Sequence, residues 1–264
     1  MRRVIAAAVF VLPAALAVAA IATGANWITT CNFSHLNNDD PIVFPLQFGA
    51  SHRHEYVGAR TTNAASTPSS LRAGGTTCGM AGDTSGYWAP DALNYSLGTS
   101  KHALFYYRGS PAVRAFPDGL KMIVGRAAAT SEASNPGIAS GHIKFKCGPG
   151  SNTEYPRPPA SCSSGVLVPV VEFPNWWNGR DLDSADHLSH MSYSRDAAHP
   201  IELPRIKAYI RYAVPAGQPI NFALSSGPYY TYHLDFFNAW NQAELQRFID
   251  RCMKTGANCG VNPQ

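Results

Sequence analysis

Six cysteines constrain the fold of this 264-residue chain more than any other feature of its sequence. They are Cys31, Cys78, Cys147, Cys162, Cys252 and Cys259. An even number of cysteines in an exported chain predicts disulfides, and six cysteines allow fifteen pairings. Local spacing favours Cys147–Cys162 and Cys252–Cys259, which leaves Cys31–Cys78. No C-x-x-C motif is present, so we expect these cysteines to cross-link loops and not to bind zinc or exchange electrons.

The first 25 residues have the layout of a secretory signal peptide. A short positive region precedes the almost wholly apolar residues 4–21 and the small residues 22–25. Cleavage is expected after residue 25 or after residue 20. An uncleaved membrane anchor is the alternative, because the apolar stretch is close to spanning length, but Pro13 and the small residues favour cleavage. We therefore expect residues 26–264 to form a single secreted domain with no transmembrane helix.

The charge of the chain excludes one class of partner. Its formal net charge is +4, and Arg2 and Arg3 of the leader contribute two of these charges, so the mature chain carries about +2. No run of Lys or Arg is present, so nothing in the sequence predicts binding to nucleic acid. We expect an extracellular monomer.

Alternation of apolar and polar residues predicts a mainly β fold. Along Arg205–Val214 the apolar side chains fall on one face, while Lys207, Tyr209 and Arg211 fall on the other, as in an antiparallel strand with one wet face. Shorter strands are expected at residues 103–107, 120–124, 142–146, 166–173 and 220–224.

One helix is expected near the C-terminus. Asn241 is a suitable N-cap, Glu244 follows three residues later as in a capping box, and Gly256 is placed to end the helix. The sequence therefore predicts an antiparallel β-sandwich or jelly roll with long disulfide-closed loops and one C-terminal helix.

Several common active-site motifs are absent. The segment from Gly82 to Gly86 places its serine one position too late for a nucleophile elbow, and His54-Glu55 is not followed by the second histidine of a zinc protease. No phosphate-binding G-x-x-x-x-G-K loop is present. These absences count against a serine hydrolase, a nucleotidase or a zincin.

Histidines carry the strongest chemical signal. His52 and His54 share one face of an extended segment, and His233 and Asp235 share another. Asp186 precedes the pair His187 and His190, and His35 is a further candidate near Asp39 and Asp40.

Three interpretations of these histidines remain open. Converging imidazoles could bind a transition metal such as Zn, Cu or Ni, or a His and an Asp could act as general base and acid. Alternatively, each histidine could be a structural group that ties a loop to the sheet through hydrogen bonds.

Aromatic side chains give a second signal. Partly exposed rings stack on sugars, whereas buried rings form the core, and core is the better expectation for most of them. Trp176 and Trp177 are expected in a loop at the mouth of a site, because Pro174, Asn175 and Gly179 hold that segment out of regular structure.

Ordered motifs along nearly the whole mature chain resemble a known family. They are Phe33-Ser34-His35, Asp40-Pro41-Ile42-Val43, Ser51-His52-x-His54, Phe116-Pro117-x-Gly119-Leu120-Lys121-Met122-Ile123-x-Gly125, Phe173-Pro174-x-x-Trp177-x-Gly179, Asp186-His187-x-x-His190-Met191 and His233-x-Asp235-Phe236. The family is a domain of unknown function found in secreted fungal and actinobacterial proteins, sometimes beside WSC carbohydrate-binding modules. The resemblance implies an extracellular role on cell-wall polysaccharide.

We therefore predict a secreted protein that cleaves an extracellular or cell-wall polysaccharide, as a hydrolase or a lyase. The predicted catalytic residues are His52, His54, His233, Asp235 and Lys121, and Asp186 would orient them. The predicted substrate-binding residues are Tyr87, Trp88, Trp176 and Trp177. The predicted ligands of one divalent metal ion, Zn, Cu or Ca, are His35, His52, His54, His187 and His190. The alternatives are a non-catalytic module that binds wall glycans or metal ions, and a structural wall protein.

Overall fold

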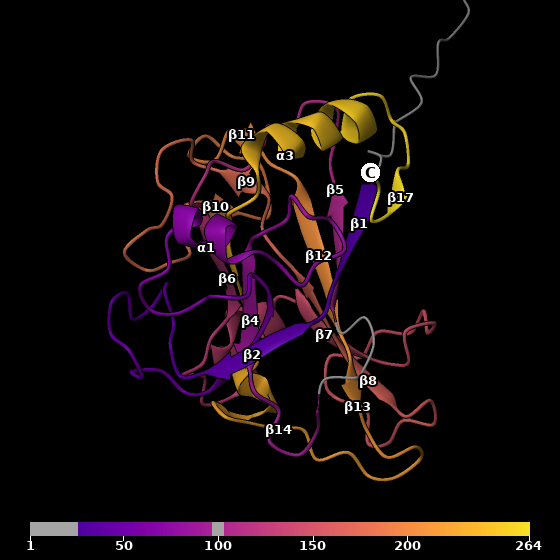
Figure 1. The fold of residues 1–264 in the computed structure, drawn as a ribbon. Coiled ribbons are helices and arrows are strands. Elements are labelled where there is room, and N and C mark those ends of the chain that lie inside the picture. Colours follow the sequence, from indigo (N-terminus) through magenta and orange to yellow (C-terminus); the bar gives the residue numbers. More distant parts are fainter. Residues whose placement is uncertain (1–25, 97–102) are drawn as a thin grey trace, which may run out of the picture.

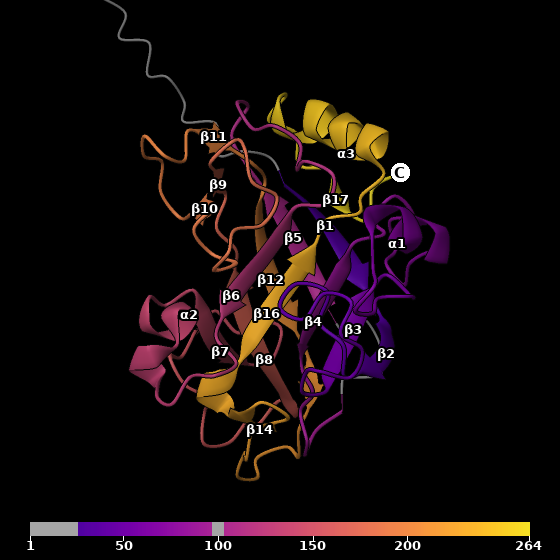
Figure 2. The same ribbon diagram turned by 90° about the vertical axis from the view of Figure 1, so that its left-hand side faces the viewer.

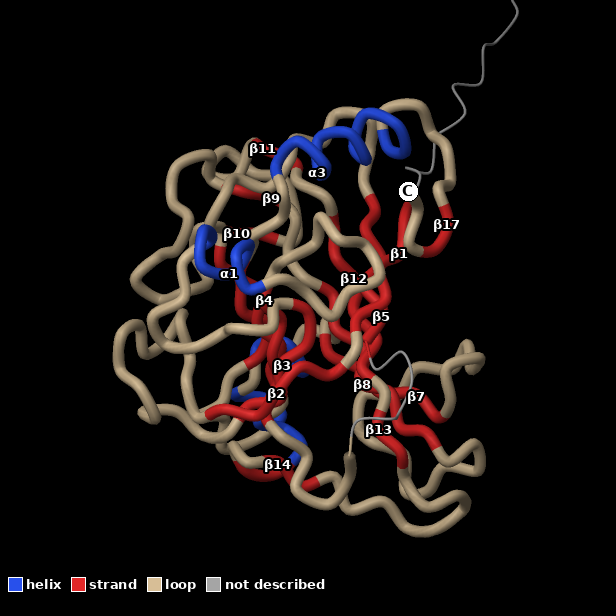
Figure 3. The backbone as a smooth tube through the Cα atoms, viewed as in Figure 1, coloured by secondary structure: helices blue, strands red, loops and turns tan. Residues whose placement is uncertain are grey.

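The computed structural model describes residues 26–96 and 103–264, and the predicted signal peptide lies outside them. The chain is mainly β, with several antiparallel sheets and one longer helix near the C-terminus, as the sequence predicts (Figure 3). The short helices are α1 (Pro68–Gly74), α2 (Pro136–Ala139) and the 3-10 turns η1 (Glu132–Ser134) and η2 (Tyr229–Thr231). Within the described residues, no helix has both the length and the apolar character needed to span a bilayer.

A seven-stranded sheet forms one layer (Figure 1). Its path runs β13 (Tyr212–Ala213), β8 (Val166–Glu172), β12 (Arg205–Ile210), β5 (Ala103–Arg108), β1 (Asn26–Cys31) and β17 (Gly260–Val261), and β7 (Ile143–Cys147) also pairs with β8. Only the β1–β17 pair is parallel among the described strands. The predicted alternation is confirmed on β12, where Ile206 and Ala208 are buried while Lys207 and Tyr209 are half-buried on the wet face.

A five-stranded sheet forms the second layer. Its order is β2 (Phe33–Asn37), β3 (His54–Gly58), β4 (Gly86–Pro90), β16 (His233–Phe237) and β6 (Lys121–Gly125). Figure 2 shows this sheet in front of β8 and β12. Both sheets contribute to one core, for example Phe105 from β5 and Leu234 and Phe236 from β16.

The outer face of the five-stranded sheet carries polar residues and a second, smaller core. On β16, His233 and Asp235 alternate with Leu234 and Phe236 and therefore point away from the main core. Loops cover this face, and Ile42 from one loop packs in the smaller core. Because the strand directs these polar side chains to the outer face and loops cover that face, the side chains are buried outside the main core.

Two short sheets complete the fold. One contains β10 (Met191–Ser192), β9 (Trp176–Trp177) and β11 (Ile201–Glu202), and the other contains β14 (Ala223–Leu224) and β15 (Gly227–Pro228). The expectation of a loop at Trp176 and Trp177 was wrong, because their backbone pairs on both sides with strands that follow later in the chain. The strand expected at residues 220–224 is reduced to β14.

All three disulfide pairings are confirmed. Cys31–Cys78, Cys147–Cys162 and Cys252–Cys259 close loops with sequence separations of 47, 15 and 7 residues. Disulfides persist in oxidising compartments, so the three bonds are consistent with a secreted protein.

The C-terminal helix begins where the sequence predicts it. Helix α3 (Gln242–Phe248) continues as a π-helical segment, Ile249–Met253. The backbone N–H of Glu244 donates to the side chain of the N-cap Asn241 at 3.1 Å. The Glu244 side chain binds Arg247 instead of returning to the cap.

The N-cap gives a first testable prediction. Asn241→Ala leaves the N–H of Glu244 without its acceptor and is expected to lower the free energy of unfolding by about 1 kcal/mol. Urea titration followed by circular dichroism measures this loss. Asn241→Ser, which keeps an acceptor, serves as the control, and equal losses in the two variants would contradict a capping role.

Candidate metal centre

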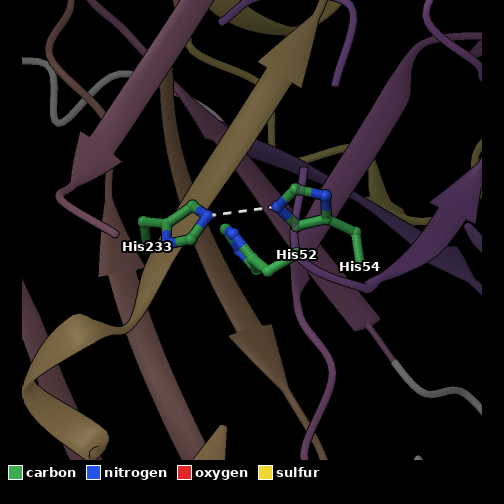
Figure 4. Close-up of side chains that lie close together, drawn as sticks. All are labelled: His52, His54 and His233. Carbon is green, nitrogen blue, oxygen red and sulfur yellow. Dashed lines mark hydrogen bonds between the residues drawn. The ribbon is translucent and has the colours of Figure 1, made fainter. Parts of the chain in front are cut away.

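Three imidazoles meet on the outer face of the five-stranded sheet. His54 begins β3, His233 begins β16, and β4 lies between these two strands. His52 lies two residues before His54 in the segment that leads into β3. Figure 4 shows the three rings turned toward one another from these separate segments. One nitrogen from each ring lies within 4.8 Å of a nitrogen of the other two.

Backbone carbonyls fix the tautomers of two of these rings. The Nδ1–H of His54 donates to the carbonyl of Asp39 at 3.1 Å, and the Nδ1–H of His233 donates to the carbonyl of Thr231 at 3.0 Å. The Nε2 atom of each neutral ring therefore presents a lone pair. Such hydrogen bonds are the usual outer-shell support of histidines that ligate a metal.

The two lone pairs face each other at short range. Nε2 of His54 lies 3.3 Å from Nε2 of His233 (Figure 4). Nitrogens on a tetrahedral zinc ion, each about 2.0–2.1 Å from the metal, lie about 3.3–3.4 Å apart. Two acceptors this close repel each other unless a cation or a proton lies between them, so the spacing suits a shared metal ion.

Burial keeps the three rings neutral. It lowers the pKa of His52 to about 4 and that of His233 to about 3. The pKa of His54 is also well below its usual value, first through burial and then through the neighbouring imidazoles. Neutral imidazole is the form that ligates metals. The buried Nε2 of His52 has no hydrogen-bond partner among the described residues, so it is free to act as a third ligand.

Two carboxyl groups adjoin the imidazoles. Oxygen atoms of Asp40 and Asp235 lie within 4.8 Å of each other and of a His54 nitrogen. Burial raises the pKa of Asp235 well above its usual value, the charge of Asp40 adds to this rise, and the indole N–H of Trp88 opposes it. Neither Asp235 oxygen nor that N–H makes a hydrogen bond of ordinary geometry within the described chain. Asp235 is therefore a buried acid with unused hydrogen-bonding capacity.

Asp40 shapes the loop beside the site. Its carboxylate accepts the backbone N–H groups of Ile42 and Val43 at 2.8 and 3.0 Å. Burial raises the pKa of Asp40, and these two hydrogen bonds oppose the rise. Asp40 lies near His35 in the sequence, but no role was expected for it, because nothing local indicates that this loop folds over β16.

A cavity of about 520 Å³ opens onto this centre. Its lining includes His52, His233, Asp235, Asp40, Val43, Phe44, Ile123, Arg126, Asp186, His187, Leu188, Ser225 and Ser226. The volume lies within the range of small-molecule sites. The cavity combines imidazoles, carboxyl groups and hydroxyls with an apolar wall.

The other histidines predicted as metal ligands lie elsewhere. His35 stacks on Tyr56, and its two ring nitrogens contact Ser34 Oγ and the carbonyl of Thr62. His190 is buried, with Ser184 Oγ and the carbonyl of Lys121 as its partners. Both nitrogens of each ring thus contact polar groups away from the three converging histidines, and neither ring joins that cluster.

His187 and Asp186 line the cavity without joining the cluster. The Nδ1 atom of His187 contacts Asp183 at 2.9 Å. Backbone and hydroxyl groups of Ser189, together with Ser184, donate to Asp186 and hold the pKa of that carboxyl below its usual range. Asp186 thus fixes the turn that carries His187.

The remaining predicted residues are not directed into the cavity. The Lys121 ammonium donates to the carbonyl of Pro41 at 2.9 Å and does not line the cavity. Tyr87 and Trp88 are fully buried and leave no face on which a sugar could stack. Trp176 and Trp177 are half-buried in the small sheet, where the indole N–H of Trp177 donates to the carbonyl of Asp181.

A second group of residues with potential ligand atoms does not form a metal site. Cys31, Cys78 and Asp83 lie close together, but the two cysteines form a disulfide and have no thiolate to offer. Asp83 instead accepts hydrogen bonds from the hydroxyls of Tyr87 and Tyr107.

Comparison with known proteins identifies the family. No curated protein and no solved structure matches the chain. A family described as a domain of unknown function, DUF1996, matches residues 40–240. This range contains His52, His54, His233 and both carboxyl groups, so the centre lies within the matched residues. The chain therefore belongs to the DUF1996 family.

Proposed function

We propose that His52, His54 and His233 hold a divalent transition metal ion, and that the protein uses this centre to cleave an extracellular polysaccharide. The observation that carries the proposal is the pair of Nε2 lone pairs facing each other at 3.3 Å. Three neutral nitrogen donors suit Zn or Cu, whereas Ca prefers oxygen ligands. A bound ion of this kind polarises a substrate oxygen or lowers the pKa of water.

The chain's own groups suit proton transfer beside such an ion. Asp235 lines the cavity, and burial raises its pKa, which favours the protonated acid. A protonated carboxyl group can donate to the oxygen that leaves when a glycosidic bond breaks. Hydrolysis and elimination both need this donation, so the same residue serves either reaction.

The cavity suits a sugar unit. Ser225, Ser226 and Asp186 offer hydrogen bonds to hydroxyl groups, and Leu188 and Ile123 offer apolar contact. Three disulfides agree with an extracellular place of action, where wall polysaccharides are found.

The test is metal-dependent product release. Protein stripped with a chelator and then reloaded with Zn²⁺ or Cu²⁺ is incubated with a panel of wall polysaccharides. New reducing ends report hydrolysis, and additional unsaturated ends report elimination. We expect product only from the reloaded protein, and about 100-fold slower release from Asp235→Asn, because a general acid contributes at least that factor.

A surface carboxylate supplies the control. Asp118→Asn removes a carboxylate that pairs with Arg72 outside the cavity, and it is expected to keep full activity. Equal rates with and without metal would refute the metal-dependent reaction. Binding without any product would favour the non-catalytic module.

A further inference from the structure

The wet face of the seven-stranded sheet gathers cations that the linear sequence keeps apart. They are Arg108 from β5, Lys144 and Lys146 from β7, Arg205 and Lys207 from β12, and Arg211 just after β12. Because successive side chains of a strand alternate between faces, cations at every second position collect on one face without forming a run. The absence of a basic run in the sequence therefore concealed a basic surface.

Half of these cations are neutralised by carboxylates. Glu154 lies 2.9 Å from Lys207 and 3.5 Å from Lys144. Glu172 lies 3.1 Å from Arg205. Glu154 and Glu172 therefore neutralise Lys144, Lys207 and Arg205.

The other three cations form no ion pair with a carboxylate in the described chain, and all of them line one cavity. Arg108, Lys146 and Arg211 surround a space of about 250 Å³ together with Tyr106 and Tyr209. Ser151 and Asn152 add polar groups at its edge. Unpaired cations gathered in one cavity form a site for negative charge.

Burial makes the lack of partners significant. Lys146 is only 7% exposed, and the Nε–H of Arg211 is buried without a hydrogen-bond acceptor in the described residues. Burial lowers the pKa of both groups. The charge of Glu154 offsets this effect at Lys146 only in part. A buried cation with incomplete compensation is unfavourable, so an incoming anion would relieve a cost that the folded chain already carries.

Aromatic rings form part of the same wall. The Tyr106 and Tyr209 rings lie 5.1 Å apart, Arg108 lies over Tyr106, and Lys146 lies over Tyr209. Tyrosine edges and faces beside cations suit a ligand that presents apolar ring surface next to anionic groups. A chain of uronic acid residues has both.

We propose that this cavity binds an acidic polysaccharide through its carboxylate groups. The site is separate from the histidine centre, since it lies on the outer face of the other sheet, and it does not depend on any metal or reaction there. Arg211 and Lys146 receive carboxylates, and Arg108 extends the contact along the strand direction of β5.

Binding of a uronate polymer tests the proposal. Polygalacturonate is titrated into the intact protein by calorimetry at low salt, with its methyl-esterified form as the uncharged comparison. We expect binding of the acid form only, weakening as salt is raised. Arg211→Gln is expected to weaken binding at least about 10-fold, since it removes the cation with which a carboxylate of the polymer would form a charge-assisted hydrogen bond.

Matched variants separate the site from general charge effects. Arg60→Gln removes one exposed cation from the segment after β3 and is expected to leave binding unchanged. Lys146→Gln tests the contribution of the same cavity to binding if Arg211→Gln fails to fold. Unchanged binding in both cavity variants, equal binding of the methyl ester, or equal binding of single-stranded DNA of the same charge would overturn the proposal.

Discussion

Alanine at both His54 and His233 is expected to abolish stoichiometric metal binding. The wild-type protein, purified without chelating resin and offered Zn²⁺, should hold about one ion per chain, because three imidazole nitrogens already converge within 4.8 Å. Loss of a single outer-shell partner typically weakens metal affinity about 10- to 100-fold. Removing two direct ligands should therefore weaken it by more than about 100-fold. Elemental analysis and competition with a chromogenic chelator measure both quantities.

The control for this double variant is another pair of histidines. His142 stacks on Tyr193 and His199 pairs with Asp196, so His142→Ala/His199→Ala removes two imidazoles outside the cluster. That protein should keep its metal. Near-ultraviolet circular dichroism confirms that each variant remains folded. Equal metal content in the two double variants would contradict the centre.

Metal binding should also stabilise the fold. A ligand that binds only the native state adds about 4 kcal/mol at a free concentration 1,000 times its dissociation constant. The stabilisation should be present in the wild type and in the control pair, and absent from His54→Ala/His233→Ala. This readout does not require any substrate.

Asp83→Asn is expected to make the protein more stable than the wild type at neutral pH. Burial raises the pKa of Asp83 from 3.8 to about 7, although the hydroxyls of Tyr87 and Tyr107 donate to it. Between these two pH values the unfolded chain releases a proton that the folded chain retains. The free energy of unfolding therefore falls as pH rises through this window, by about 4 kcal/mol for this group alone.

Asparagine mimics the protonated acid and does not ionise. We expect Asp83→Asn to match the wild type near pH 4 and to exceed its stability by up to about 4 kcal/mol near pH 7. Urea titrations across this range measure the difference. Asp250→Asn, a change on the exposed surface of the π-helical segment Ile249–Met253, should follow the wild-type slope. If the free energy of unfolding of Asp83→Asn changed with pH as steeply as that of the wild type, Asp83 would be ionised in the folded protein.

Local patterns predicted the parts of the fold that depend on neighbouring residues. The alternation around Arg205–Ile210, the cap at Asn241 and the three disulfide pairings were all readable from spacing. The order of strands was not, because pairing partners lie far apart in the chain. Trp176 and Trp177 show the limit, since turn-forming neighbours predicted a loop where distant strands complete a sheet.

The sequence predicted that the candidate site contains histidine and aspartate, but it identified only some of the residues that form it. Side-chain parity placed His52 with His54 and His233 with Asp235, but His54 and His233 are 179 residues apart. Nothing local indicates that β3 and β16 flank the same strand. The sequence alone also predicted His35 and His190 as metal ligands, because it does not show where they lie in the fold. In the structure these rings bind the carbonyls of Thr62 and Lys121, away from the cluster. Asp40 and the basic surface required the folded chain.

The placement of β4 between β3 and β16 would also determine when the proposed metal ion could be taken up. The two facing nitrogens come together only after both strands have paired with β4, so the unfolded chain offers no such pair. Long-range strand pairing of this kind is slow, because the entropy of closing a long loop must be overcome first. The disulfides are consistent with folding in an oxidising compartment. The metal supply of that compartment, and not that of the cytosol where the chain is made, would then decide which element the protein carries.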